Sequence, residues 1–123
     1  MLEAYSQNVT VVANQAIPFN NVTLKKGCTA ELITPTTVQF NRCGVYCVDC
    51  DVSAGTSSTI QLYKDGVAQP QTISTGTTPH IYTFVVAESN SNDCPCTLPT
   101  TIQIIDATAG TLTNASIKIT KLC

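Results

Sequence analysis

Three cysteines and two aspartates lie close together in the segment CGVYCVDCDV at 43–52. Cysteine thiolates bind zinc or form disulfides and carboxylates bind calcium, so these residue types could form a metal or redox site. The segment also alternates between apolar and polar residues, which is typical of a half-buried strand. On such a strand Tyr46 and Cys50 share the core face, whereas Cys47 and Asp49 point outward.

The spacing of Cys47 and Cys50 is that of the C-x-x-C motif found in zinc and redox sites. Residues three apart on a strand point to opposite faces, and a redox pair needs a helix N-terminus to lower its thiol pKa. We therefore expect a structural strand, with Cys50 filling core space and Cys47 on the outer face.

One histidine and two carboxylates are the other candidates for chemistry. His80 follows Pro79 at the start of a strand-like segment, and no cysteine is marked as its nucleophile, so we expect a strand-edge residue and no enzyme. Asp49 and Asp51 share one face and could bind calcium. Calcium takes six or more oxygens, which favours a solvated face. No resident cofactor is expected, with zinc or calcium as the alternatives.

The segments around these residues have the composition of strands. Only 11% of the 123 residues are charged and 43% are hydrophobic, which favours half-buried strands over solvated helices. Turn signals separate short β-rich runs, and Asp65-Gly66 is the clearest hairpin signal. A single all-β domain over 1–123, an antiparallel sandwich or jelly roll, is predicted. Its strands are expected at 8–13, 16–19, 21–27, 29–33, 38–40, 44–53, 59–66, 67–73, 80–88, 100–106 and 114–122.

The segment at 80–87 is apolar on both faces. Tyr82 and Phe84 lie on one face, and Ile81 and Val85 on the other. A strand that is apolar on both sides in an antiparallel sandwich has apolar material outside it, and a subunit interface is the usual source.

The order of these segments resembles the tumour-necrosis-factor-like jelly roll, in the branch with the complement globular heads and the heads of bacterial collagen-like proteins. The resemblance covers nearly the whole chain and is carried by QAIPFNN (15–21), GVY (44–46), IQLYKDGVAQP (60–70) and TIQIIDATAGTLTNASIKITKL (101–122). It implies a ten-strand-type fold and a compact homotrimer with both chain ends near one pole. The trimer interface is expected at Tyr46, Ile81, Tyr82, Phe84 and Val85.

On this jelly-roll order, four cysteines should lie near the pole with the chain ends: Cys43, Cys94, Cys96 and Cys123. They could bind zinc tetrahedrally, form disulfides, or remain free thiols, and the odd total of seven leaves at least one thiol free or paired between chains. A bond between Cys94 and Cys96 would be strained by its short link.

The chain is also similar to small free-standing members of this family among the structural proteins of phages that infect gut Firmicutes. That similarity implies a capsid decoration or head-fibre protein, made in the host cytoplasm and carried on the virion surface, with the capsid protein as its partner. No signal peptide or transmembrane run is visible, and a net charge of −2 gives no basic surface for nucleic acid or membrane.

Two other functions stay open. One is a receptor- or glycan-binding head of a phage fibre, which would use the loops 53–58, 74–79 and 107–113 at the pole opposite the chain ends to meet a host surface glycan. The other is the head of a bacterial or spore-surface collagen-like protein.

Overall fold

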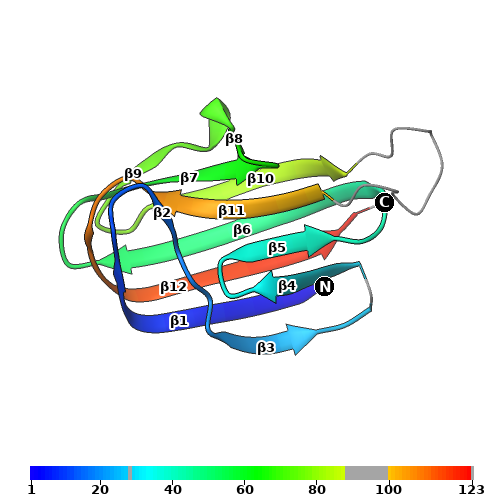
Figure 1. Ribbon diagram of the computed structural model, residues 1–123, viewed down its shortest axis with the longest axis horizontal. Coiled ribbons are helices and arrows are strands. Elements are labelled where there is room, and N and C mark those ends of the chain that lie inside the picture. Colours follow the sequence, from blue (N-terminus) through cyan, green and yellow to red (C-terminus); the bar gives the residue numbers. More distant parts are fainter. Residues whose placement is uncertain (28, 88–99, 123) are drawn as a thin grey trace.

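The computed structural model describes residues 1–27, 29–87 and 100–122, which form an all-β fold (Figure 1). Within them no helix is long and apolar enough to cross a membrane. The elements are β1 (Leu2–Val11), β2 (Gln15–Ala16), β3 (Asn21–Lys25), β4 (Ala30–Thr34), β5 (Thr37–Phe40), β6 (Gly44–Ala54), β7 (Ser58–Lys64), β8 (Val67–Ala68), the 3-10 turn η1 (Pro70–Thr72), β9 (Ser74–Gly76), β10 (His80–Ala87), β11 (Thr100–Asp106) and β12 (Gly110–Lys121).

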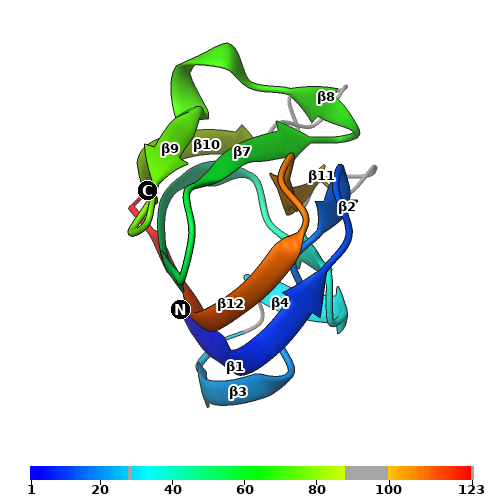
Figure 2. The ribbon, with the colours of Figure 1, turned by 90° about the vertical axis from the view of Figure 1, so that its left-hand side faces the viewer.

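Two antiparallel sheets face each other across one core (Figure 2). The first sheet has the order β10-β6-β12-β1-β3, and the second has the order β4-β5-β11-β7-β8, with β2 beside β11 and β9 beside β7. The pairing of β1 with β12 joins the two ends of the chain, from Leu2↔Ile119 to Val11↔Gly110. β1 therefore begins, and β12 ends, at the same end of the molecule, on the right of Figure 1.

The alternation in β6 places its side chains as the sequence predicts. Tyr46, Val48 and Cys50 have no exposed surface, whereas Cys47 is half-buried and Asp51 is exposed. Full burial of an aliphatic side chain such as Val48 contributes about 1.5–3 kcal/mol to stability. The inward row of β6 is therefore a central part of the core.

Tyr46 is an anchor inside the subunit. Its ring lies 4.2 Å from the ring of Phe40, centroid to centroid. Its hydroxyl donates a 2.7 Å hydrogen bond to the Arg42 carbonyl oxygen and lies 3.3 Å from that of Thr29. The buried phenol is thus satisfied within its own chain, as a buried hydroxyl must be.

The hairpin expected at Asp65-Gly66 is confirmed. Lys64 pairs with Val67 across a two-residue turn, in which Asp65 and Gly66 have φ of 51° and 81°. Positive φ at both central residues matches the right-handed twist of the strands. The Asp65 carboxylate also accepts a 2.9 Å hydrogen bond from the Thr101 amide, which ties the turn to β11.

Several predicted strand bounds differ from the structure, most clearly at β1 and β8, and β9 was not predicted. β1 begins at Leu2 and ends at Val11, whereas a strand was expected at 8–13. The strand expected at 67–73 is short: β8 is followed by η1, which begins at Pro70 because proline fits the first position of a helical turn.

Candidate functional site

Strand β10 forms one edge of the first sheet and pairs only with β6 among the described strands. Its outward side chains form a surface that we call the apolar patch: Tyr82, Phe84 and Val86, which are 60%, 56% and 40% exposed. The rings of Tyr82 and Phe84 meet edge to face, with centroids 6.0 Å apart. Two aromatic residues exposed side by side on a flat sheet are what an interaction surface offers.

The expected trimer interface needs correction. Tyr46, Ile81 and Val85 are at most 4% exposed and lie in the core, so they offer a partner almost no surface while the sandwich is closed. The sequence separated the two faces of β10 correctly but did not show which face looks inward. Tyr82 and Phe84 remain accessible, and their place at an interface stays a prediction.

The apolar patch is confined to the β10 side of its sheet. On β12, Lys118 points outward beside Asp49 of β6, and Thr120 lies beside Cys47. On β1 the outward Glu3 is bonded to the Thr23 hydroxyl. The outer face thus changes from apolar at β10 to polar toward β1.

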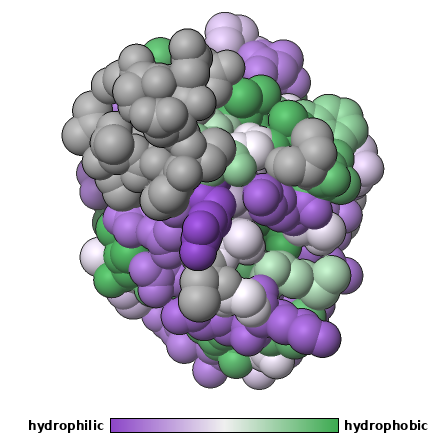
Figure 3. All heavy atoms as spheres, turned by 90° about the vertical axis from the view of Figure 1, so that its right-hand side faces the viewer, coloured by the Kyte–Doolittle hydropathy of each residue, from purple (hydrophilic) through white to green (hydrophobic). Residues whose placement is uncertain are grey.

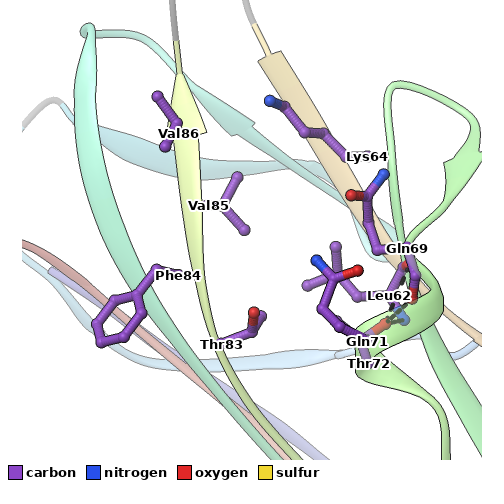
Figure 4. A pocket seen from close by; sticks show the side chains of 9 residues that line it. All are labelled: Leu62, Lys64, Gln69, Gln71, Thr72, Thr83, Phe84, Val85 and Val86. Atoms are coloured by element: carbon purple, nitrogen blue, oxygen red, sulfur yellow. Dashed lines mark hydrogen bonds between the residues drawn. The ribbon is translucent and has the colours of Figure 1, made fainter.

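A groove of about 200 Å³ runs along the free edge of β10, between it and the second sheet. Leu62 and Val85 lie at its apolar side, while Lys64, Gln69 and Gln71 supply polar groups (Figure 4). Figure 4 also shows Phe84 on the side of β10 away from Val85. The sequence pattern does not predict this groove, because the groove forms only where η1 packs near β10.

Asp49, Asp51 and His80 form a cluster at the opposite end of β10 from Val86. The Nε2 atom of His80 lies 2.6 Å from Oδ1 of Asp49 and 3.5 Å from Oδ1 of Asp51. The backbone amide of His80 donates to the Ser74 hydroxyl at 3.0 Å. Asp49 and Asp51 point outward as expected, but they meet His80 because β10 lies beside β6.

The described cysteines differ in state. Cys43 is disulfide-bonded, whereas Cys47 is a half-buried and Cys50 a buried free thiol. Burial raises the pKa of Cys50, and the charges of Asp51 and Asp49 add to the effect. The expectations for disulfides or zinc at Cys94, Cys96 and Cys123 concern residues outside the described part of the chain, as does Cys28.

Cys47 also contacts the apolar patch. A hydrogen bond with Cys47 raises the pKa of Tyr82, and the charge of an ionised Cys47 is the next cause. The phenol therefore holds its proton more tightly than an exposed tyrosine does.

Three loops meet at the left-hand end of Figure 1, as the sequence predicts for 53–58, 74–79 and 107–113. The amide of Ala54 donates to the Thr77 carbonyl oxygen at 2.8 Å, and Leu112 pairs with Ala54. The hollow among the first and third loops has about 10 Å³, the room of about one water. The opposite end, seen in Figure 3, mixes hydrophilic and hydrophobic residues on its described surface.

Three solved structures are similar to the whole domain. Rabbit GITRL matches with a TM-score of 0.60 and 12% identity, over 100% of this chain and 95% of that chain. Murine APRIL, in crystals at pH 8.0 and pH 8.5, matches with TM-scores of 0.64 and 0.65, at 11% identity over 98% of both chains. No protein-family model and no curated protein matches the sequence.

GITRL and APRIL are jelly rolls of the tumour-necrosis-factor superfamily. The match extends over both sheets, which confirms the fold that the sequence predicted, and at this identity it concerns the fold alone. The chain therefore has the tumour-necrosis-factor-like jelly-roll fold.

Proposed function

We propose that the chain is a homotrimeric interaction head whose subunits associate through β10. The observation that carries the proposal is the apolar patch: Tyr82 and Phe84 are more than half exposed, and their rings meet edge to face on the outer side of β10. Soluble proteins expose single apolar residues often, but adjacent exposed aromatics mark contact surfaces. The fold adds support, since the resemblance implies a trimer.

The patch and the groove adjoin each other on one subunit. The patch lies on the outer face of β10, and the groove lies along its free edge, where Phe84 and Val86 of the patch also line it. When the patch of one copy packs against the groove of the next, the contact is heterologous, and it forms a ring where the rotation between copies closes. Three copies in a ring also cover the free edge of β10, which would otherwise invite uncontrolled strand pairing.

The patch supplies part of the energy that a stable assembly needs, and the rest must come from the surfaces around it. A Tyr or Phe buries roughly 150–250 Å² when enclosed, so each of these exposed rings has about 100 Å² left to bury. At about 25 cal/mol per Å², Tyr82 and Phe84 together contribute roughly 5 kcal/mol per contact.

Replacing Phe84 by Asp tests this surface directly. In the trimer the new carboxylate would be buried without a partner, so the dissociation constant should rise by more than about a hundredfold, or roughly 2.7 kcal/mol. The matched control is Ile33→Asp, at an exposed apolar residue of β4 in the other sheet. Sedimentation velocity of both variants measures their assembly. If Phe84→Asp assembles as the wild type does, the apolar patch is not part of the interface.

A finer proposal concerns the biological setting. We infer from the resemblance that the trimer is a capsid decoration or head-fibre protein on a phage virion, bound to the capsid protein. Mass spectrometry of purified particles tests this role: the chain should be recovered in fixed ratio to the capsid protein. A gene lying instead beside a Gly-X-Y coding sequence would point to a collagen-like protein head.

The alternative is a receptor- or glycan-binding head. The loops 53–58, 74–79 and 107–113 are rich in Ser, Thr and Gly and meet at one end. Because the hollow there is too small for a sugar ring, a glycan would have to lie on the surface. A glycan array with the isolated protein separates the two roles, and specific binding lost on changes in these loops would favour the alternative.

A further inference from the structure

Asp49, Asp51 and His80 bring three metal-ligating atoms to one point on the outer face of the first sheet. One carboxylate oxygen from each aspartate and one nitrogen of His80 all lie within 4.8 Å of one another. His80 stands directly opposite Asp51 in the β10-β6 register, and Asp49 follows on the same face. Two hydrogen-bonded strands therefore fix the spacing of the three side chains, as a preorganised site requires.

The charge of the cluster favours a cation. Among the described residues, no Lys or Arg nitrogen lies within 4.0 Å of a carboxylate oxygen of Asp49 or Asp51, although Lys118 stands opposite Asp49 on β12. With a neutral imidazole, the three side chains carry two negative charges. A divalent cation would neutralise them and relieve the repulsion between the carboxylates.

The ligand set indicates the class of metal. Calcium takes six to eight oxygen ligands, so an imidazole nitrogen argues against it. Imidazole with carboxylates suits zinc and similar first-row divalent metals. We propose that Asp49, Asp51 and His80 form a surface site for Zn²⁺ or a related transition metal, with water completing the coordination on the exposed side.

The geometry needs little adjustment. Bonds of about 2.0–2.2 Å to a tetrahedral zinc place the ligand atoms roughly 3.3 Å apart. The separation of 3.5 Å between His80 and Asp51 already fits, and the 2.6 Å contact between His80 and Asp49 must open by under about 1 Å. On binding, Nε2 gives up any proton it carries, either to solvent or by a change of tautomer to Nδ1, and its hydrogen bond with Asp49 is replaced by the metal.

The site lies beside the apolar patch, since Asp49 stands opposite Tyr82 in the register. It has an unambiguous probe, because His80 is the only histidine in the chain. We suggest titrating ¹⁵N-histidine-labelled protein with Zn²⁺ after its accessible thiols have been alkylated, since thiolates also bind zinc. The imidazole resonances should shift and saturate at one Zn²⁺ per chain. The same amount of Ca²⁺ should leave them unmoved, and displacement of Zn²⁺ by equimolar Ca²⁺ would overturn the metal class.

Variants separate a three-ligand site from a lone histidine. The double change Asp49→Asn with Asp51→Asn should weaken zinc binding by more than about tenfold, which is what loss of even a supporting partner costs. The control is Glu31→Gln, which alters a carboxylate of β4 in the second sheet that pairs with Lys25 and should leave zinc binding unchanged. Equal zinc affinity in the double variant and the wild type, or no saturation at all, would overturn the proposal.

Discussion

Tyr82 and Ile81 are neighbours in β10, yet Tyr82 is 60% exposed and Ile81 is 2% exposed. Because successive strand residues point to opposite faces, one packs into the core and the other stands on the outer face. The two positions should therefore respond to truncation in different ways.

Replacing Ile81 by Ala should lower the free energy of unfolding by about 2–5 kcal/mol, since it removes buried methylene groups and leaves a cavity. Replacing Tyr82 by Ala should change the stability of the single subunit by only about 0.5 kcal/mol, as is usual for an exposed residue. Urea unfolding of dilute protein measures both. Equal losses at the two positions would contradict the assignment of the faces.

A buried hydrogen bond supports the end of the molecule where the three loops meet. Asp106 is fully buried, and its Oδ2 accepts a 2.7 Å hydrogen bond from the Ser58 hydroxyl, while Oδ1 accepts from the Thr108 amide. Replacing Ser58 by Ala should cost about 1–3 kcal/mol, because a buried acceptor loses its partner. Thr75→Ala removes only an exposed hydroxyl contact and should cost far less, so similar melting curves for the two variants would be a contrary result.

The contact between Tyr82 and Cys47 predicts a pH dependence. The raised pKa of Tyr82 means that it ionises at higher pH than an ordinary tyrosine, and burial in an interface would raise the pKa further. The stabilisation from this contact is present at neutral pH and is lost as the pH rises through the raised pKa. The difference between the ultraviolet titrations of the wild type and Tyr82→Phe should show this raised pKa. Cys47→Ala, which removes both the hydrogen bond and the thiol charge, should lower the pKa of Tyr82 toward the ordinary value.

The two free thiols of β6 should differ in reactivity. Thiolates are the reactive form, and burial raises the pKa of Cys50, so it should resist alkylation in the native protein. Peptide mapping after brief exposure to iodoacetamide should find Cys50 modified only in denaturant. Native modification of Cys50 as fast as that of Cys47 would show that the core opens readily.

The strands with strong alternation were predictable from the sequence, and β1 was not. In β1 the inward residues include Ala4 and Ser6, which give almost no hydrophobic signal. Ser6 is buried because it donates to the Pro18 carbonyl oxygen and accepts from the Asn20 amide, contacts that depend on the tertiary structure. Asn8, with φ of 52°, also interrupts the alternation. Pairing with β12 therefore determines this strand.

The candidate sites were also predictable only where they depend on local periodicity. Periodicity placed Asp49 and Asp51 on the outer face and Cys50 in the core, because parity along one strand is a local property. It could not place His80 beside the aspartates, since that depends on β10 pairing with β6 across roughly 30 residues of sequence. The sequence contains a histidine at the start of one strand and an acidic pair in another. These residues indicate a metal site only once the register between the two strands is known.

The mass of the native assembly tests the central claim most directly. Sedimentation equilibrium at micromolar concentration should give three times the 13.0 kDa mass of the chain, with a shift toward single subunits in Phe84→Asp. A wild-type protein that stays at 13.0 kDa, with Tyr82 and Phe84 exposed to solvent, would contradict the account.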